Sequence, residues 1–378
     1  MKFTYVNVSI LIFALVLVSG CTGIPDVFGR DVISVQQNTV QNGVRDIVTL
    51  NDIITIPKSP LLPDQQVVFS FIAANNDKLK NTNVVVDLFN APTMRDVTGS
   101  NPCNLYIGQP TCSINLGQCV SPTGTTTQGP YCLPDQCGVD STSTDSNGVV
   151  RSGCMILPGE QKQINFQLRT PGQAEIANIK TDTKLDFKVT YDFDGTLTYL
   201  IPAISTDEII KRQRSGDKTT LFTSKSYSSG PVQVDVTIQG APYMLSDTSG
   251  RPTDTVLLFT VKNIGSGNIV NSQIKSNDMT ILFPPEFEVD PQKYSDKFIC
   301  TAASGGTLCA NSATGSGGED IGKIELYKDE SRSSLYFTVR LQQPLQEPFR
   351  TFQIISNIKY SYELRDSVSL TINPFQNV

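Results

Sequence analysis

The stretch FKVTYDFDGTLTYLI (residues 187–201) decides the fold predicted for this chain. Apolar side chains occupy alternate positions on both sides of its central Asp-Gly, which is the pattern of antiparallel strands with one face in water. If Tyr191 lies opposite Leu197, the apolar side chains of two such strands share one face. That register leaves a three-residue loop whose third position, Gly195, suits the left-handed conformation. The stretch therefore predicts a β-hairpin that turns at Asp194 and Gly195.

The letters DFDGTL also match the D-x-D-G-T run of haloacid dehalogenase-like phosphatases. This resemblance implies a phosphorylated aspartate at Asp192 and a general acid at Asp194. In that fold the run ends a parallel strand that is buried on both faces and is continuously apolar in sequence. The strict alternation before Asp192 argues against such a strand, and a short motif without its structural context carries little weight. An exported carboxylate-dependent hydrolase is therefore the less favoured alternative.

Composition limits the chemistry of the chain. Its 378 residues include no histidine and no tryptophan, and 30 Lys and Arg against 36 Asp and Glu give a net charge of −6. Without histidine, Ser-His-Asp and Cys-His catalysis and histidine-containing metal sites are excluded. An acidic chain argues against nucleic acid as a partner. Composition leaves only chemistries that run on carboxylates, Lys or Cys, and we predict no catalysis, no cofactor and no metal.

The first 20 residues have the pattern of an export signal. Lys2 precedes an apolar run (residues 6–18) that leads into Ser19-Gly20-Cys21. This ending resembles the lipobox of secreted lipoproteins, in which the cysteine becomes the lipid-carrying first residue. A run of roughly 13 residues is shorter than the roughly 20 that span a bilayer, which argues against an uncleaved anchor helix. We predict a lipid on Cys21 that holds the protein to a membrane outside the cytoplasm.

Eight cysteines remain after Cys21, six in the first half of the chain and two in the second. An even number in an exported protein predicts disulfides, and the spacings lack the C-x-x-C pairs of zinc sites. Cys300 and Cys309 have no other partner in their half, so we predict that they pair and pin a surface loop. The sequence leaves open the pairing of the other six, which are Cys103, Cys112, Cys119, Cys132, Cys137 and Cys154.

Two strand-like segments occur twice, 171 residues apart. QINFQL (residues 163–168) corresponds to SLYFTV (residues 334–339), and residues 187–201 correspond to residues 358–372. In the second copy DFDGTL is replaced by ELRDSV, which keeps the apolar alternation and loses the glycine. One kind of hairpin would serve both copies, and this is a further argument against a phosphatase.

Upstream, FIAAN (residues 71–75) corresponds to the start of FTVKNIGSGN (residues 259–268) at an offset of 188. The repeat and these strand ends resemble the CARDB-type and related immunoglobulin-like β-sandwich domains of prokaryotic surface proteins, in which an F-x-V-x-N-x-G strand end is common. The resemblance covers both halves loosely and implies adhesion, spacing or assembly at the cell surface. A disulfide-rich insertion in the first copy, at about residues 98–156, lies outside it.

Short Val-, Ile- and Phe-rich runs, separated by Pro, Gly, Asn and Asp, predict an all-β chain. We expect two tandem immunoglobulin-like antiparallel β-sandwich domains. The predicted parts are a lipoprotein signal peptide (1–20), a flexible spacer (21–45), a first domain (46–204), a linker (205–218) and a second domain (219–378).

Two polar segments allow other interpretations. DSTSTDSNG (residues 140–148) places oxygen ligands at alternate positions as a calcium loop does, but it lacks the closing acidic residue, so a turn is favoured. The basic run KRQR (residues 211–214) could contact anionic lipid, but a solvated connector of one or two helical turns is favoured.

Together these features predict a membrane-anchored surface lipoprotein that acts as a non-catalytic structural, adhesion or binding module. Its predicted partners are the membrane, through Cys21, and a surface protein or polymer that the sequence does not identify. An alternative is a subunit of an extracellular filament or surface complex assembled by β-strand exchange, which requires an exposed sheet edge.

Overall fold

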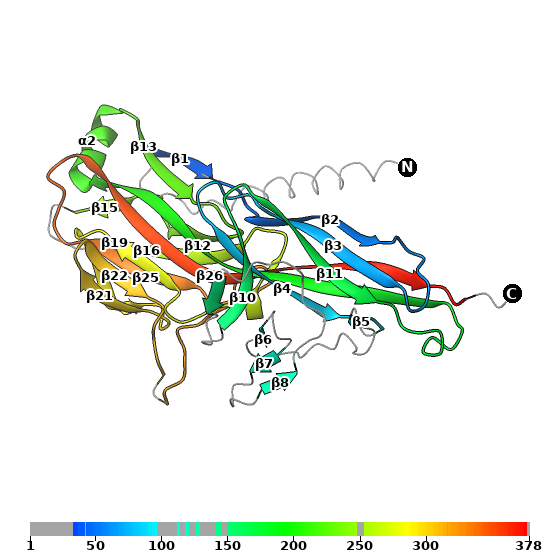
Figure 1. Ribbon diagram of the computed structural model, residues 1–378. Helices are drawn as coiled ribbons and strands as arrows, with labels where there is room; N and C mark the ends of the chain where they lie inside the picture. The colour runs from blue at the N-terminus through cyan, green and yellow to red at the C-terminus, as the bar shows by residue number, and fades with distance from the viewer. Residues whose placement is uncertain are drawn as a thin grey trace, which may run out of the picture.

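The computed structural model describes residues 33–41, 43–91, 93–96, 150–247, 253–315 and 317–375, and four short strands between residues 112 and 144. In these residues the regular secondary structure is almost entirely β-strand, with one α-helix, α2 (Thr206–Ser215). The body is elongated, with most strands of the first half of the chain toward one end and most strands of the second half toward the other (Figure 1). The predicted all-β fold is confirmed.

Two long strands run side by side through both halves (Figure 1). β12 (Thr181–Ser205) pairs antiparallel with β26 (Phe349–Ile372) in one register along its length. Tyr191 lies opposite Tyr362 near the middle of this pairing. These tyrosines are also the same position in the two copies of the repeat, 171 residues apart. An antiparallel pair centred on equivalent residues has an approximate two-fold axis, so the two halves are related by a rotation about an axis that passes between Tyr191 and Tyr362.

Each half is a sandwich of two facing sheets, and each long strand contributes to both sandwiches. In the first half β4 lies beside the first part of β12, and the facing sheet has the order β2-β3-β11-β5. In the second half β19, β22 and β21 continue the sheet beside β26, and β14, β16, β25 and β20 face them. The bounds are β2 (Val48–Ile56), β3 (Gln66–Asn75), β4 (Thr82–Asn90), β5 (Arg95–Asp96), β11 (Gln161–Arg169), β14 (Val232–Gln239), β16 (Thr255–Asn263), β19 (Met279–Phe283), β20 (Phe287–Tyr294), β21 (Ile299–Ala303), β22 (Gly306–Ala310) and β25 (Leu335–Leu341).

Shorter strands complete the sheets. β13 pairs with the last part of β12, and β1 pairs with β13 in parallel. β15 also joins β12, β17 joins β26, β10 joins β4 and β9, and β6 to β8 form a small sheet of their own. Their bounds, with the remaining elements, are β1 (Ile33–Gln41), β6 (Cys112–Ser113), β7 (Gln118–Val120), β8 (Thr126–Gln128), β9 (Ser141–Thr144), β10 (Val150–Ile156), β13 (Thr219–Tyr227), β15 (Met244–Ser246), β17 (Asn268–Ile269), η1 (Val270–Ser272), β18 (Gln273–Ile274), β23 (Ile324–Tyr327) and β24 (Glu330–Ser331).

Aromatic side chains link the facing sheets of each sandwich. The ring centre of Phe187 on β12 lies 4.6 Å from that of Phe71 and 5.1 Å from that of Phe69, both on β3. In the second half the rings of Phe337 and Phe283 lie 5.3 Å apart. All five are fully buried, and each such burial contributes about 1.5–3 kcal/mol. Because the inward positions of β12 continue from one sandwich into the next, the two cores form one cluster.

The hairpin predicted at Asp194 and Gly195 is wrong. β12 passes straight through DFDGTL, and Gly195 pairs with Ile358 of β26 instead of turning. Gly195 is not among the residues with positive φ, and Tyr191 has Tyr362 as its cross-strand partner. An uninterrupted strand keeps the same alternate side chains in the core. It also pairs with β26 along its whole length, and a hairpin would lose half of this pairing.

The segment predicted as the linker holds α2. Ser205 caps the helix through a bond from Glu208 N, and Gly216 ends it in the left-handed conformation at φ 77°. Arg212 Nε lies 2.6 Å from Glu208 Oε1 within the helix. The KRQR run therefore lies in a capped helix of 10 residues, which is longer than the one or two turns expected. The domain boundaries themselves stay a prediction, since β12 and β26 each belong to both sandwiches.

Candidate interaction surface

The two aspartates of DFDGTL lie on the outer face of β12, in the middle of the strand. Asp192 Oδ1 accepts a hydrogen bond from Ser361 Oγ of β26, and Asp194 Oδ2 lies 2.7 Å from Lys80 Nζ. The Asp194 side chain is 56% exposed. The carboxylates are therefore placed on an open antiparallel face, not at the end of a buried parallel strand as in the phosphatase alternative.

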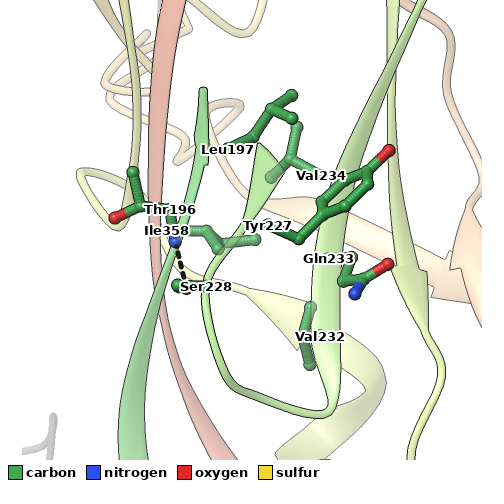
Figure 2. Close-up of a pocket in the computed structure, with 9 residues that line it drawn as sticks. Thr196, Leu197, Tyr227, Ser228, Val232, Gln233, Val234 and Ile358 are labelled. Carbon is green, nitrogen blue, oxygen red and sulfur yellow. Dashed lines mark hydrogen bonds between the residues drawn. The ribbon is translucent and has the colours of Figure 1, made fainter. Parts of the chain in front are cut away.

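Gly195 permits a close approach of another chain segment. A Cβ at this position would lie 3.3 Å from Val232 O and 3.4 Å from Ile358 Cγ2. The neighbouring Thr196 N donates a hydrogen bond of 2.8 Å to Ser228 Oγ (Figure 2). The cavity beside these residues measures about 10 Å³, which is room for about one water molecule. The site holds the link between β13 and β14 against β12 and is too small for an organic ligand.

The predicted disulfide between Cys300 and Cys309 is confirmed. The two residues lie opposite each other on β21 and β22, with their Cα atoms 3.9 Å apart. At the start of β22, directly after the turn, Gly306 has a φ of 131°, and a Cβ there would clash with Phe283 O. The bond pins a surface hairpin at the edge of the second sandwich, as expected, and does not join the halves.

Several predicted sites lie outside the described residues, among them Cys21, Cys103, Cys132 and Cys137. Cys112 and Cys119 lie opposite each other in β6 and β7. Cys154 of β10 is buried and disulfide-bonded. Of the calcium-loop candidate, Ser141–Thr144 form β9, and the other residues lie outside the described part of the chain.

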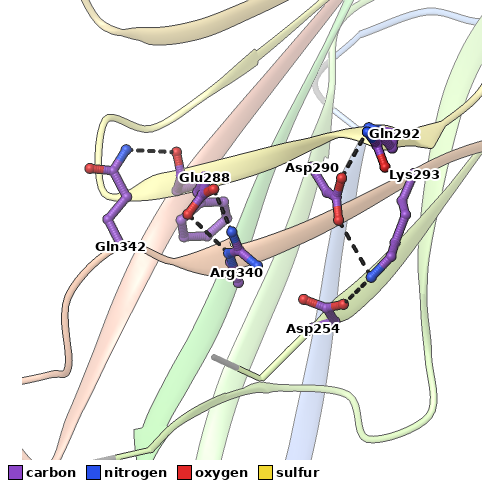
Figure 3. Close-up of polar contacts among 8 residues, drawn as sticks. Asp254, Glu288, Asp290, Gln292, Lys293, Arg340 and Gln342 are labelled. Atoms are coloured by element: carbon purple, nitrogen blue, oxygen red, sulfur yellow. Dashed lines mark hydrogen bonds and ion pairs between the residues drawn. The ribbon is translucent and has the colours of Figure 1, made fainter. Parts of the chain in front are cut away.

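An open groove of about 240 Å³ lies beside β20 and β25. Arg340 on its wall binds Glu288 through two contacts, of 2.9 Å from Nε and 2.5 Å from Nη2 (Figure 3). Nearby, Lys293 Nζ lies 2.8 Å from Asp254 and 3.4 Å from Asp290. The Arg340 hydrogen bond lowers the pKa of Glu288, and the Asp254 hydrogen bond raises the pKa of Lys293. Each of these charges already has a partner within the protein, so the groove is a poor candidate for recognising a charged ligand.

Two asparagines at equivalent strand ends make the same turn, which the sequence analysis did not identify. Asn75 Oδ1 of β3 accepts a hydrogen bond of 3.0 Å from Asp77 N, and Asn263 Oδ1 of β16 accepts one of 3.2 Å from Gly265 N. Each side chain thus binds the backbone two residues further on. The signal was the asparagine that ends both FIAAN and FTVKN. The repeat therefore preserves turn chemistry as well as strands.

Asn263 also belongs to the seam, the contact of Tyr191, Asn263, Gly267 and Tyr362 where the halves meet. Tyr362 Oη donates a hydrogen bond of 2.9 Å to Asn263 Oδ1 and accepts one of 2.8 Å from Gly267 N. The rings of Tyr362 and Tyr191 lie 5.7 Å apart. Burial raises the pKa of both tyrosines. Sequence reasoning missed the seam because its residues are up to 171 positions apart.

β1 is the outermost strand at one edge of the large sheet. It pairs with β13 from Ile33↔Thr219 to Gln41↔Tyr227, and no described strand pairs with its other edge. Ile33 and Val35 are half-buried, whereas the side chains at positions 34 and 36–40 are exposed. Its sequence, ISVQQNTVQ, contains no charged residue, proline or glycine. This strand is the candidate interaction surface.

Among the residues that the structure describes, groups of three or more potential metal-ligating side chains are absent. The same residues include no helix with the length and apolar character needed to cross a membrane.

No protein-family model matches the chain, and no curated protein matches it. The C-terminal domain of the Streptococcus agalactiae AgI/II polypeptide BspA is 9% identical, with a TM-score of 0.15, over 88% of this chain and 97% of its own. One chain of the CsuC-CsuE complex, a chaperone with a tip adhesion subunit from Csu pili of Acinetobacter baumannii, is 8% identical to this chain. The TM-score is 0.15, and the match covers 90% of this chain and 99% of that one. A mutant of the enterotoxigenic E. coli CFA/I adhesin CfaE is 9% identical, with a TM-score of 0.13, over 91% and 99%. Likeness at this level carries no functional argument.

Proposed function

We propose that the protein is a non-catalytic surface module that acts in adhesion, spacing or assembly and is held to a membrane outside the cytoplasm by a lipid on Cys21. The observation that carries the proposal is the unbroken pairing of β12 with β26. A strand of 25 residues extends roughly 80 Å at about 3.3 Å per residue. Because this pair belongs to both sandwiches, it makes them one stiff body, which suits a module that holds a surface at a fixed distance from its anchor.

The placement of the carboxylates supports a role without catalysis. Asp192 and Asp194 lie on a flat strand face, where Ser361 and Lys80 already bind them. Enzymes hold substrates in concave sites where catalytic groups converge. A flat face with paired side chains is instead typical of a solvated sheet surface.

An assay of Asp194→Asn separates the module from the hydrolase. We expect the purified full chain to leave generic phosphoesters intact with and without magnesium. Asp366→Asn, on the repeat-equivalent segment of β26, serves as the matched control. A magnesium-dependent hydrolysis that is lost in Asp194→Asn and kept in Asp366→Asn would refute the proposal.

A second candidate, a filament or complex subunit assembled by β-strand exchange, is favoured by the position of β1. In such an exchange β1 would leave its own β13 and pair with β13 of the next molecule. Ser34 Oγ and Thr220 Oγ1 lie 3.1 Å apart, so Ser34→Cys with Thr220→Cys can lock β1 in place. Electron microscopy decides: filaments that form from the wild type and not from the locked variant indicate exchange, and filaments from both exclude it.

A further inference from the structure

We propose that β1 is a self-association edge, at which the β1 strands of two copies pair antiparallel and continue the large sheet from one molecule into the other. This inference rests on the proposed surface function and deepens it by naming the partner, a second copy of this chain. Unlike strand exchange, it leaves β1 on its own β13. The outer edges of β2 and β14 and a part of β26, in contrast, are blocked against such pairing.

The edge of β2 is interrupted by its backbone and followed by prolines. Its pairing with β3 has a bulge between Asn51 and Ile54, and Asp52 within it has a φ of 50°. Pro57 and Pro60 follow directly and have no N–H to donate. Bulges and prolines of this kind prevent a second molecule from extending a sheet.

Aspartates block the edge of β14 and the part of β26 that lies beyond its pairing with β17. On β14, Asp235 Oδ1 accepts a 2.8 Å hydrogen bond from Val236 N, and on β26 Asp366 Oδ1 accepts a 2.7 Å hydrogen bond from Ser367 N. An amide that is bound by a side chain is not available to a neighbouring strand. Asp235 also lies 2.6 Å from Lys225 Nζ, so this edge carries charge as well.

β1 has none of these features. It is nine residues long, its pairing with β13 is regular over the whole length, and it carries no charge, proline or bulge. Exposed edges without such protection are templates for pairing with another chain. In the part of the chain that the structure describes, the outer edge of β1 has no strand beside it and none of these protections, whereas β2, β14 and the last part of β26 have them.

The side chains of β1 identify a second copy as the partner. Its exposed positions are Ser, Gln, Asn, Thr and Val, which can be donors and acceptors for the same residues opposite and meet no like charge. A two-fold axis perpendicular to the sheet reverses the strand direction, so two β1 strands related by it are antiparallel. The same patch then serves both molecules.

The small area of the β1–β1 contact indicates that the pairing forms between copies anchored to the same membrane. A pair of nine-residue edges buries less than the roughly 1,000 Å² of a stable interface, so the pairing is weak between free molecules. Anchoring both copies to one membrane raises their effective concentration. Cys21 lies 12 residues before Ile33, and such a segment reaches at most about 40 Å. Two anchors at opposite ends of the strand pair can therefore reach the same bilayer.

The test places like charges on the edge. Gln36→Lys with Asn38→Lys puts two lysines on each β1, whereas the control, Thr351→Lys with Gln353→Lys, adds the same charge to exposed positions of β26, which β12 and β13 separate from β1. The full chains are compared in mild detergent by sedimentation at rising concentration, and on phosphatidylcholine vesicles by energy transfer between labelled copies. We expect dimers of the wild type and the control, and a dissociation constant raised at least roughly tenfold in the edge variant.

The outcomes are distinguishable. A wild type that is monomeric in both settings, an edge variant that pairs like the wild type, or a control that weakens equally would each overturn the inference. Pairing that is lost in the locked Ser34→Cys and Thr220→Cys variant would assign the association to strand exchange and also overturn it. Protein recovered without lipid would contradict the proposed anchor, whereas the detergent measurement would still test β1.

Discussion

Replacing Gly267 by alanine tests how much the close packing around Tyr362 of the seam contributes to the stability of the protein. A methyl group there would lie 2.3 Å from Glu363 O, 2.7 Å from Leu364 Cδ2 and 2.8 Å from Tyr362 Cε1. Glu363 O is backbone of β26, which cannot move without disturbing its pairing with β12. Overpacking of this kind costs about 1–3 kcal/mol. Loss of the hydrogen bond from Gly267 N to Tyr362 Oη adds about 1 kcal/mol.

We therefore expect Gly267→Ala to lower the free energy of unfolding by about 2–4 kcal/mol. The measurement is urea unfolding of the full chain, followed by circular dichroism. Gly317→Ala is the matched control, because Gly317 is exposed and a Cβ there would meet nothing within 4 Å. Equal stability of the two variants, within about 0.5 kcal/mol, would refute the role assigned to the seam.

Three further predictions follow from the disulfide, the buried tyrosines and the anchor. Replacing Cys300 and Cys309 by serine should remove about 2–3 kcal/mol on the loop-entropy model and lower Tm by a few degrees without unfolding the protein; an unchanged Tm would contradict this. Burial raises the pKa of Tyr191 and Tyr362 above the usual value of 10.0, so the stability that their neutral forms contribute is present below about pH 10 and falls as the pH rises further; unfolding midpoints that stay constant between pH 9 and about 11.5 would contradict it. Cys21→Ser should release protein to the medium or leave an uncleaved precursor; unchanged fractionation and mass would exclude the lipid.

The strands were predictable because their pattern is local. Alternation in QINFQL and SLYFTV identified β11 and β25, and the repeat identified β3 and β16 as equivalents. The pairing of Cys300 with Cys309 was predictable because no other cysteine exists in that half. Each of these inferences needed only residues that are close in sequence or that recur at the fixed offset of the repeat.

The continuity of β12 was not predictable from alternation. A three-residue hairpin loop and a straight strand both keep Tyr191 and Leu197 on the same face, so the pattern is identical for the two structures. The partner that decides between them is β26, whose pairing with β12 is a long-range contact. The second copy gave a hint, since it keeps the alternation without any glycine.

The difference between Gly195 and its repeat equivalent, Asp366, has a physical cause in the position of β1. At Gly195 the link between β13 and β14 lies against the strand, and the next amide, Thr196 N, donates to Ser228 Oγ of that link. In the other half β1, the strand that corresponds to β13 in chain order, lies on β13 instead of on β26. Asp366 is therefore exposed, and its own side chain accepts the equivalent amide of Ser367. Gly195 in DFDGTL thus makes room for the link between β13 and β14, and the second copy has no such link beside Asp366. The departure of β1 from the two-fold arrangement therefore accounts for both the glycine in one copy and the aspartate in the other.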